Sequence, residues 1–312
     1  MTGPLDRRSF VGAVAGLGLA MTLGGARPRR RITMETRTVP STGERLPVIG
    51  MGTWQTFDVG ADPETRRGLA EVLGALVAAG GTVVDSSPMY GRSEAVLGEL
   101  ARERELERRL FVATKVWTTG RDAGIRQMER SVELLGNRTA PSGARGVDLI
   151  QVHNLVDLET QLATLRAWKD AGRIRYLGVT HYQASAHDEV AAVVRRHPID
   201  FVQINYSVND RGAERSLLPL LADRGVAVLI NRPFGGGGLF SRVRGRPFPP
   251  WAGELGIASW AQLFLKFVIS HPAVTVAIPA TSRLDHLRDN LLAGSGPMPD
   301  DASRRRIAAL FD

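Results

Sequence analysis

The chain has 312 residues, of which 43% are hydrophobic and 23% charged, the balance of an ordinary globular protein. It contains no cysteine, which excludes disulfide bonds, thiolate metal sites and cysteine nucleophiles. The formal net charge is +8, but six arginines opposed by one aspartate place +5 of it in the first 31 residues. The +3 left for the rest of the chain gives no electrostatic footprint for DNA or RNA, so we expect no nucleic-acid partner.

The N-terminal segment has the composition of an export signal. The motif Arg7-Arg8-Ser9-Phe10 precedes an apolar run, 11–23, that is rich in Ala, Gly and Leu and short for a membrane span. The paired arginines resemble a twin-arginine signal, so we expect the twin-arginine export machinery as a partner and a periplasmic or extracytoplasmic location. Cleavage after Ala26, with no stable span afterwards, and an uncleaved anchor both stay open, as does a basic terminus without a targeting role. We assign residues 1–33 to the signal and a basic linker, and residues 34–312 to the folded domain.

After the signal, short apolar runs alternate with longer amphipathic stretches. Apolar and polar residues alternate on both sides of Ser41-Thr42-Gly43, which predicts a β-hairpin. Apolar residues at helical spacing predict helices over 64–79 and 161–171. Eight further runs have the continuous apolar character of strands that are buried on both faces. These runs are 48–53, 82–85, 110–116, 148–153, 174–180, 201–207, 226–231 and 275–279.

Eight strands, each followed by a helical stretch, imply parallel pairing through right-handed crossovers. Eight such units in roughly 250 residues fit a closed barrel better than an open sheet. The sequence therefore predicts an α/β protein, a (β/α)8 TIM barrel with an N-terminal β-hairpin. In such a barrel the functional residues lie at the C-terminal ends of the strands and in the loops that follow.

Four chemically capable residues obey this rule. Asp85 ends the second run, Tyr90 follows in its loop, Lys115 lies near the end of the third run, and His153 ends the fourth. Taken singly, Asp85 could cap a turn, Tyr90 could be a packed aromatic, and His153 could be a core histidine with satisfied hydrogen bonds. A purely structural role does not explain Lys115, because burying a charged side chain in a strand is energetically costly. The chain also uses arginine for nearly all of its other basic residues.

Together these residue types suit the reduction of a carbonyl group. Such a reaction needs a hydride donor, a proton donor and a polar setting for the developing alkoxide. Tyrosine, with a pKa of about 10, is a weak acid at neutral pH, and a nearby ammonium lowers that pKa by favouring the phenolate. A carboxylate that holds the lysine keeps it charged and in place, and an imidazole N–H can polarise the carbonyl.

Several motifs, in this order, resemble the signatures of the aldo-keto reductase superfamily. They are MGTW (51–54), VVDSSPMYG (83–91), FVATKV (111–116), DLIQVHN (148–154), GRIRYLGVTHY (172–182), VQINYS (202–207), NRPFGGG (231–237) and IPATSRLDHLRDN (278–290). The resemblance covers 48–290, nearly the whole folded chain, and fits a bacterial member with a twin-arginine signal. It implies that Tyr90 donates a proton, that Lys115 and Asp85 lower its pKa, and that His153 orients the carbonyl of the substrate.

The resemblance also implies that reduced nicotinamide lies across the strand ends. Gln203 matches the glutamine that contacts the carboxamide, and Thr180 and His181 stand where the family usually has Ser-Asn. Asn231 stands where the family often has an aromatic residue that stacks on the nicotinamide. Either the affinity for the cofactor is lower, or Phe234 or Tyr206 supplies the missing ring. The segment that begins Asn231-Arg232-Pro233-Phe234 belongs to the expected cofactor site.

At the other end of the cofactor, Thr281, Ser282 and Arg283 resemble the segment that holds the adenosine 2′-phosphate. Asp289 and Asn290 are expected near the adenine. A guanidinium forks well onto a phosphate, so we predict NADPH as the cofactor, with NADH less favoured. The glycines at 235–238 could cradle phosphate through their N–H groups or could form a flexible connector.

The predicted activity is the NADPH-dependent reduction of a small aldehyde or ketone to an alcohol. Trp54 and Trp117 follow strand ends and are expected to line the substrate pocket, whereas Trp168 and Trp260 fall in helical stretches and are expected in the core. The alternative is a nicotinamide-binding sensor or accessory subunit with little turnover, because a fold does not fix a function. A metal site is not expected, since the six histidines show no ligand spacing such as H-E-x-x-H.

Overall fold

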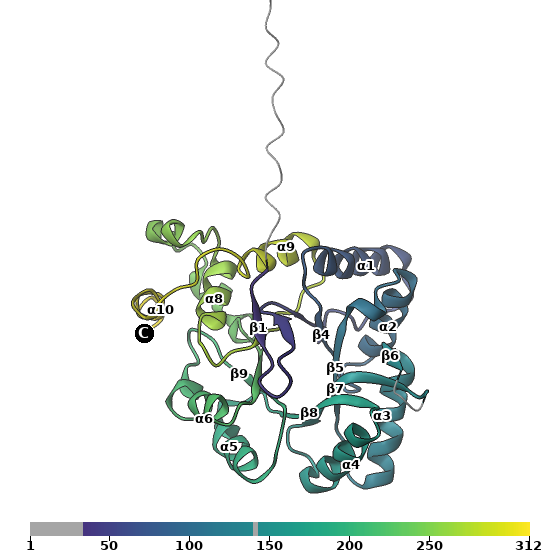
Figure 1. Ribbon diagram of the computed structural model, residues 1–312. Coiled ribbons are helices and arrows are strands. Elements are labelled where there is room, and N and C mark those ends of the chain that lie inside the picture. Colours follow the sequence, from purple (N-terminus) through teal and green to yellow (C-terminus); the bar gives the residue numbers. More distant parts are fainter. Residues whose placement is uncertain (1–33, 140–142) are drawn as a thin grey trace, which may run out of the picture. The chain divides into compact units, whose positions relative to one another are not determined.

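The computed structural model describes residues 34–139 and 143–312. The export signal assigned to residues 1–33 lies outside the described residues. In the described part of the chain, eight parallel strands follow one another in a continuous sheet surrounded by helices (Figure 1). The order is β3 (Met51–Gly52), β4 (Val83–Asp85), β5 (Phe111–Val116), β7 (Arg145–His153), β8 (Ile174–Thr180), β9 (Phe201–Asn205), β10 (Ala227–Asn231) and β11 (Val276–Ala277). The predicted (β/α)8 barrel is confirmed.

The sheet closes where the first strand meets the last. Parallel bridges join Ile49 to Ala277 and Gly52 to Ala280, so the neighbours of β3 are β4 and β11. A short strand that the sequence did not predict, β6 (Arg138–Thr139), pairs antiparallel with the start of β7 outside this ring.

Helices form the outer layer and connect the strands (Figure 1). The sequence of α1 shows why it begins where it does: Asp62 accepts a hydrogen bond from the Thr65 N–H at 2.8 Å, and Pro63 occupies the first turn. The predicted helices at 64–79 and 161–171 correspond to α1 and α4. The helices are α1 (Pro63–Ala78), α2 (Ser93–Glu103), α3 (Arg121–Leu135), α4 (Leu158–Asp170), α5 (His187–Arg196), α6 (Leu217–Asp223), α7 (Gly238–Val243), α8 (Trp260–Ile269), α9 (Leu284–Leu292) and α10 (Asp301–Ala308).

The predicted hairpin covers one end of the barrel (Figure 1). Strands β1 (Thr36–Thr38) and β2 (Arg45–Pro47) pair antiparallel. Val39 and Leu46 of this hairpin share a buried apolar cluster with Phe111, Tyr176 and Phe201, which point inward from the first halves of β5, β8 and β9. The hairpin thus closes the N-terminal end of the barrel, and the C-terminal end is not covered by it.

Candidate active site

The inward-facing side chains of the barrel change from apolar to polar toward the C-terminal ends of the strands. On β5, Phe111 and Ala113 belong to the interior apolar cluster, and Lys115 is the next residue on the same face. On β9, Phe201 belongs to that cluster and Gln203 is the next inward residue. A polar layer therefore lies at the end of the barrel where active sites of this fold occur.

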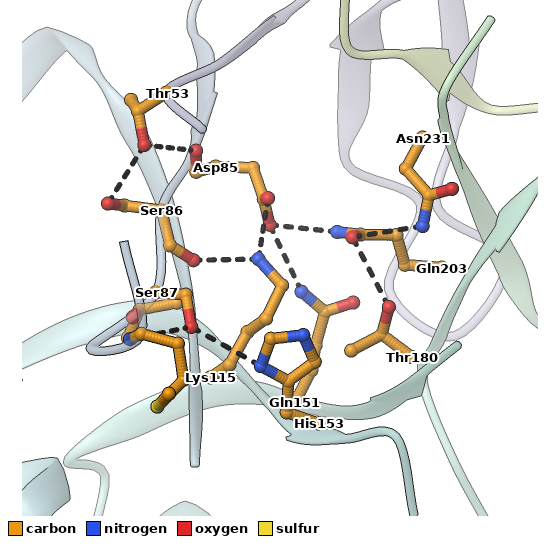
Figure 2. A network of polar contacts seen from close by, with 12 residues as sticks. Thr53, Asp85, Ser86, Ser87, Lys115, Gln151, His153, Thr180, Gln203 and Asn231 are labelled. Atoms are coloured by element: carbon orange, nitrogen blue, oxygen red, sulfur yellow. Dashed lines mark hydrogen bonds and ion pairs between the residues drawn. The ribbon is translucent and has the colours of Figure 1, made fainter. Parts of the chain in front are cut away.

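Asp85 and Lys115 form a buried ion pair in this layer. Asp85 ends β4, Lys115 lies on the adjacent β5, and the Lys115 Nζ is 2.6 Å from the Asp85 Oδ2 (Figure 2). The ammonium also donates to the Ser86 carbonyl oxygen at 2.7 Å, and Lys115 is 0% and Asp85 3% exposed. Burial alone lowers the pKa of Lys115, but the charge of Asp85, with its hydrogen bond and a further contribution from Tyr90, outweighs burial and raises the pKa above its ordinary value. The lysine is a charged ammonium inside the barrel.

Tyr90 is held beside this pair by the tight turn that follows β4. The carboxylate of Asp58 accepts a hydrogen bond from the Arg92 N–H at 2.9 Å and so anchors the turn. Gly91 has a φ of +58°, and a Cβ at this position would lie 2.4 Å from the Asp58 carboxylate, so the turn requires glycine. With the turn fixed, the Lys115 Nζ lies 4.9 Å from the centroid of the Tyr90 ring.

The pKa of Tyr90 departs from the sequence-based expectation. Burial raises this pKa, and the lowering effect of the Lys115 charge does not compensate for it. Asp85 raises the pKa further, because a carboxylate disfavours a nearby phenolate. Lys115 therefore lowers the pKa of Tyr90 as expected, whereas Asp85 does not, and burial outweighs the lowering so that the net shift is upward. Tyr90 keeps its proton at neutral pH, which suits a proton donor better than a base.

His153 completes the group predicted from the sequence. Its Nδ1 lies 3.3 Å from the Ser87 Oγ (Figure 2). Its ring meets the Tyr90 ring edge-on, with centroids 6.2 Å apart. Burial, with contributions from the charges of Lys115 and His181, lowers the pKa of His153 to about 3. The imidazole is therefore neutral at physiological pH and can donate one N–H without adding a positive charge. Ser87 was not singled out from the sequence, although it lies two residues after Asp85.

Two glutamines tie the ion pair to neighbouring strands (Figure 2). The Asp85 Oδ1 accepts hydrogen bonds from the Nε2 of Gln203 at 2.8 Å and from the Nε2 of Gln151 at 3.3 Å. Gln151 is fully buried, and Gly178 on the adjacent strand leaves it room, since a Cβ there would lie 3.2 Å from the Gln151 Cγ. Sequence reasoning missed Gln151, yet its signal was present: a polar residue in an apolar run, on the same face as His153.

The residues expected at the nicotinamide lie next to this network. The Thr180 Oγ1 donates to the Gln203 Oε1 at 3.2 Å, and the Asn231 Nδ2 lies 3.4 Å from the same oxygen and 3.4 Å from the His181 carbonyl oxygen (Figure 2). The His181 ring stacks on Tyr182 with centroids 5.7 Å apart and an angle of 5°. Thr180, Gln203 and Asn231 thus form one hydrogen-bonded set, while the His181 side chain lies on the loop.

The aromatic rings proposed to replace the stacking residue are engaged elsewhere. Tyr206 is fully buried, and its hydroxyl donates to Glu214 and accepts from the Arg304 Nη2 at 2.7 Å. The Phe234 ring packs against Phe240 with centroids 4.9 Å apart, within an aromatic cluster on α7 and α8. The buried Tyr206 is not free to stack on a nicotinamide, whereas Phe234 is only partly buried and its use as a stacking residue stays a prediction.

The segment after β10 has an unusual backbone. Arg232 has a φ of +49°, and Gly235, Gly236 and Gly237 are consecutive residues with positive φ. The guanidinium carbon of Arg232 lies 5.7 Å from the Tyr182 ring centroid, and Pro233 is buried. The two interpretations of the glycines, a phosphate cradle and a connector, both stay open.

The segment expected at the 2′-phosphate lies at the start of α9. The Thr281 Oγ1 accepts a hydrogen bond from the Arg283 N–H at 3.1 Å. Ser282 and Arg283 are exposed, and the Arg283 Nη2 pairs with the Asp285 Oδ2 at 2.6 Å. A phosphate at this position would compete with Asp285 for the guanidinium.

Asp289 and Asn290 lie on α9 and face the protein. The Asp289 carboxylate accepts hydrogen bonds from the Ser259 Oγ and the Gln262 Nε2, both at 2.6 Å. Asn290 is 3% exposed. Asp289 therefore anchors the start of α8, and any contact with an adenine would be additional to that role.

The four tryptophans considered above differ in exposure, and the place of Trp54 and Trp117 in a substrate pocket stays a prediction. Trp54 and Trp117 follow β3 and β5 and are 52% and 38% exposed. Trp168 is buried and Trp260 packs on Phe264, so both belong to the core. Further large apolar side chains that are exposed also follow strand ends: Met89, Tyr182 and Phe240.

Over residues 34–139 and 143–312, no group of three or more His, Asp or Glu side chains could hold a metal ion. In the same part of the chain, no helix has the length and apolar character needed to cross a membrane.

Fold and site together define a class of protein. A (β/α)8 barrel whose strand ends carry a buried lysine–aspartate pair, a protonated tyrosine and a neutral histidine is arranged to protonate a carbonyl oxygen. The model of the aldo/keto reductase family matches residues 48–308. The chain therefore belongs to the aldo/keto reductase family and is an oxidoreductase.

Curated relatives are similar to the chain in sequence, and a solved structure is similar to it in fold. The chain is 29% identical to the aldo-keto reductase YhdN of Bacillus subtilis (strain 168), over 63% of this chain and 61% of that protein. It is 28% identical to the methylglyoxal reductase YeaE of Escherichia coli (strain K12), over 82% of this chain and 89% of that protein. An aldo-keto reductase from Klebsiella pneumoniae, solved in complex with NADPH, has a similar fold with a TM-score of 0.74 and 24% identity, over 90% of this chain and 96% of that one.

Proposed function

We propose that this protein reduces an aldehyde or a ketone to an alcohol with NADPH, and that Tyr90 is the proton donor. The observation that carries the proposal is the contact between Tyr90 and the buried ammonium of Lys115 at the end of the barrel, where the ring centroid lies 4.9 Å from the Nζ. This contact has a clear chemical use, because the phenolate left by proton transfer would form beside a fixed positive charge.

Each residue has a distinct part in the proposed reaction. When bound, NADPH supplies the hydride that forms the new C–H bond at the carbonyl carbon. Tyr90 gives its proton to the carbonyl oxygen, Lys115 stabilises the resulting phenolate, and the phenol regains a proton from solvent. His153 donates a neutral N–H to the carbonyl oxygen and orients it, since its pKa of about 3 keeps it uncharged. Asp85 fixes the ammonium in place.

The residues at the strand ends fit a nicotinamide cofactor. The Oδ1 of Asn231 is buried and has no hydrogen-bond partner among the described residues, which marks a place for an external donor. Thr180, Gln203 and Asn231 would surround the nicotinamide. Thr281, Ser282 and Arg283 would hold the 2′-phosphate, and this favours NADPH over NADH. The complex of the Klebsiella pneumoniae relative with NADPH supports the same choice.

The reaction is tested by following NADPH oxidation with a panel of small aldehydes and ketones that includes methylglyoxal. We expect turnover by the wild type and a loss of roughly 10²- to 10⁴-fold in kcat for Tyr90→Phe, the usual range for removing a general acid. The Kd for NADPH should stay unchanged in this variant. Tight NADPH binding without turnover on any substrate, and with Tyr90→Phe indistinguishable from the wild type, would favour a sensor or accessory subunit instead.

We also propose export by the twin-arginine route, on the strength of the Arg7-Arg8-Ser9-Phe10 motif and the apolar run that follows. This route carries folded proteins, so NADPH from the cytoplasm could be bound before export. Full-length protein, expressed in a bacterium with a twin-arginine system, should be recovered from the periplasm. The double substitution Arg7→Lys and Arg8→Lys should retain it in the cytoplasm, and unchanged fractionation would contradict the proposal.

A further inference from the structure

The orientation of the Asn231 amide is fixed by a chain of hydrogen bonds that begins at Asp85. A carboxylate oxygen only accepts, so the Gln203 atom that lies 2.8 Å from the Asp85 Oδ1 must be the amide nitrogen. The Gln203 Oε1 then faces Thr180 and Asn231, as Figure 2 shows. Because this oxygen is an acceptor, Asn231 must present its NH2 group to it.

A second acceptor confirms the same orientation. The Asn231 Nδ2 also lies 3.4 Å from the carbonyl oxygen of His181. With two acceptors on one side of the amide, the Oδ1 must face the other way. Amide assignments depend on the surrounding network, and here the network leaves a single choice.

The Oδ1 of Asn231 is therefore an acceptor without a donor. It is buried and has no partner among the described residues. Buried polar atoms are nearly always hydrogen-bonded in native proteins, so an exception at a binding site indicates that a ligand or a water supplies the missing donor.

Gln203 cannot play this part, although it matches the family residue that contacts the carboxamide. Its Nε2 is committed to Asp85, and the two lone pairs of its Oε1 face Thr180 and Asn231. Among the described residues, two amide oxygens of this network have no partner: the Gln151 Oε1, which is fully buried inside the barrel, and the Asn231 Oδ1 at the end of β10, one strand further along than Gln203. The His181 side chain is no substitute, because its Nδ1 accepts a hydrogen bond from the Gln183 N–H at 3.2 Å, which leaves the Nε2 of the neutral ring as a donor.

We propose that Asn231 positions the nicotinamide by accepting a hydrogen bond from an N–H of its carboxamide. This inference rests on the proposed use of NADPH. An asparagine cannot stack on the ring as an aromatic residue would, but its hydrogen bond to the carboxamide would restrict rotation of the ring about its glycosidic bond. The chain would thus replace contact with the face of the nicotinamide by recognition of its edge.

The test compares two nucleotides by quenching of tryptophan fluorescence, which gives a Kd without turnover. One is NADP⁺; the other is its 3-acetylpyridine analogue, in which an acetyl group replaces the carboxamide and no N–H remains. The wild type should bind NADP⁺ about three- to tenfold more tightly than the analogue, the usual worth of one neutral hydrogen bond. In Asn231→Leu, which keeps the branched shape of the side chain but not the acceptor, the two Kd values should become nearly equal.

Two further variants separate this effect from general damage to the site. Asn231→Ala should also abolish the discrimination, without the crowding that a leucine could introduce. Arg283→Leu, at the proposed 2′-phosphate end, should weaken both nucleotides and leave their ratio as in the wild type. The thermal unfolding of each variant shows whether it is folded.

The outcomes separate the two proposals. A wild type that binds NADP⁺ and its analogue equally well overturns the inference and leaves the proposed function standing. Discrimination that persists in both Asn231 variants does the same. A wild type that binds neither nucleotide removes the proposed function and this inference with it.

Discussion

Replacing Lys115 with methionine removes the ammonium but keeps the length of the side chain inside the barrel. Asp85 would then be a buried carboxylate held only by the amide groups of Gln203 and Gln151. Breaking a buried ion pair on one side costs about 3–5 kcal/mol, because the remaining charge is left uncompensated. Since both amides still donate to the Asp85 Oδ1, we expect the lower end of that range, about 3 kcal/mol in the free energy of unfolding.

The double variant Asp85→Asn with Lys115→Met tests the reasoning. Both charges are then gone, so we expect a cost of only about 1–2 kcal/mol, less than that of Lys115→Met alone. Equilibrium urea unfolding at pH 7 measures the three free energies, and NADPH oxidation should be lost in the single and the double variant alike. Additive losses, with the double variant the least stable, would refute the view that an unpaired Asp85 causes the damage.

The same pair predicts how stability depends on alkaline pH. The pKa of Lys115 lies above its ordinary value of about 10.4 in the folded protein. A raised lysine pKa contributes stability that is complete below that ordinary value and is lost as the pH rises through the folded-state pKa. Lys115→Met should therefore lack this alkaline loss, and the gap between the variant and the wild type should narrow at high pH.

Two further predictions concern His153 and Gly91. The pKa of His153 is lowered to about 3, so its contribution to stability is complete above about pH 6.5 and is lost as the pH falls toward 3. His153→Asn should flatten the dependence of the unfolding free energy on pH in this window, and an unchanged slope in urea unfolding would show that the histidine is not neutral. Gly91→Ala should cost about 2–4 kcal/mol, because it combines a positive φ with a Cβ 2.4 Å from the Asp58 carboxylate. Gly43→Ala, with a φ of +78° and open space around the Cβ, should cost only about 1 kcal/mol, and equal shifts in Tm would argue against the clash.

The barrel could be predicted from the sequence because its signal is local. A strand buried on both faces is an unbroken apolar run, and each of the eight runs is followed by residues with helical spacing. Lys115 could be identified for the same reason, since burying a charge within the apolar run FVATKV is costly unless the charge has a function. Glycine likewise signals the turn after Tyr90, although only the fold reveals that Asp58 is what excludes a Cβ there.

The hydrogen-bond network of the site could not be predicted from the sequence, because it depends on contacts between strands that lie far apart along the chain. Gln203 reaches Asp85 across 118 positions, and Asn231 joins the same network through Gln203 and the His181 carbonyl oxygen. The errors have a simpler cause. Tyr206 was considered as a stacking residue because it follows a strand, but Phe201 and Gln203 point inward, so the alternation of the strand turns Tyr206 toward the helices. The period of two along this strand already excludes Tyr206 from the residues that face the interior of the barrel.

The surroundings of Tyr90 act on proton donation by its phenol in two opposite ways. Desolvation raises its pKa, which by itself makes proton donation harder. The Lys115 ammonium lies where the phenolate would form, and in a buried site its attraction for that negative charge is stronger than it would be in water. In the proposed reaction, the phenol keeps its proton until a carbonyl oxygen begins to gain charge, and the lysine then stabilises the phenolate that the transfer leaves.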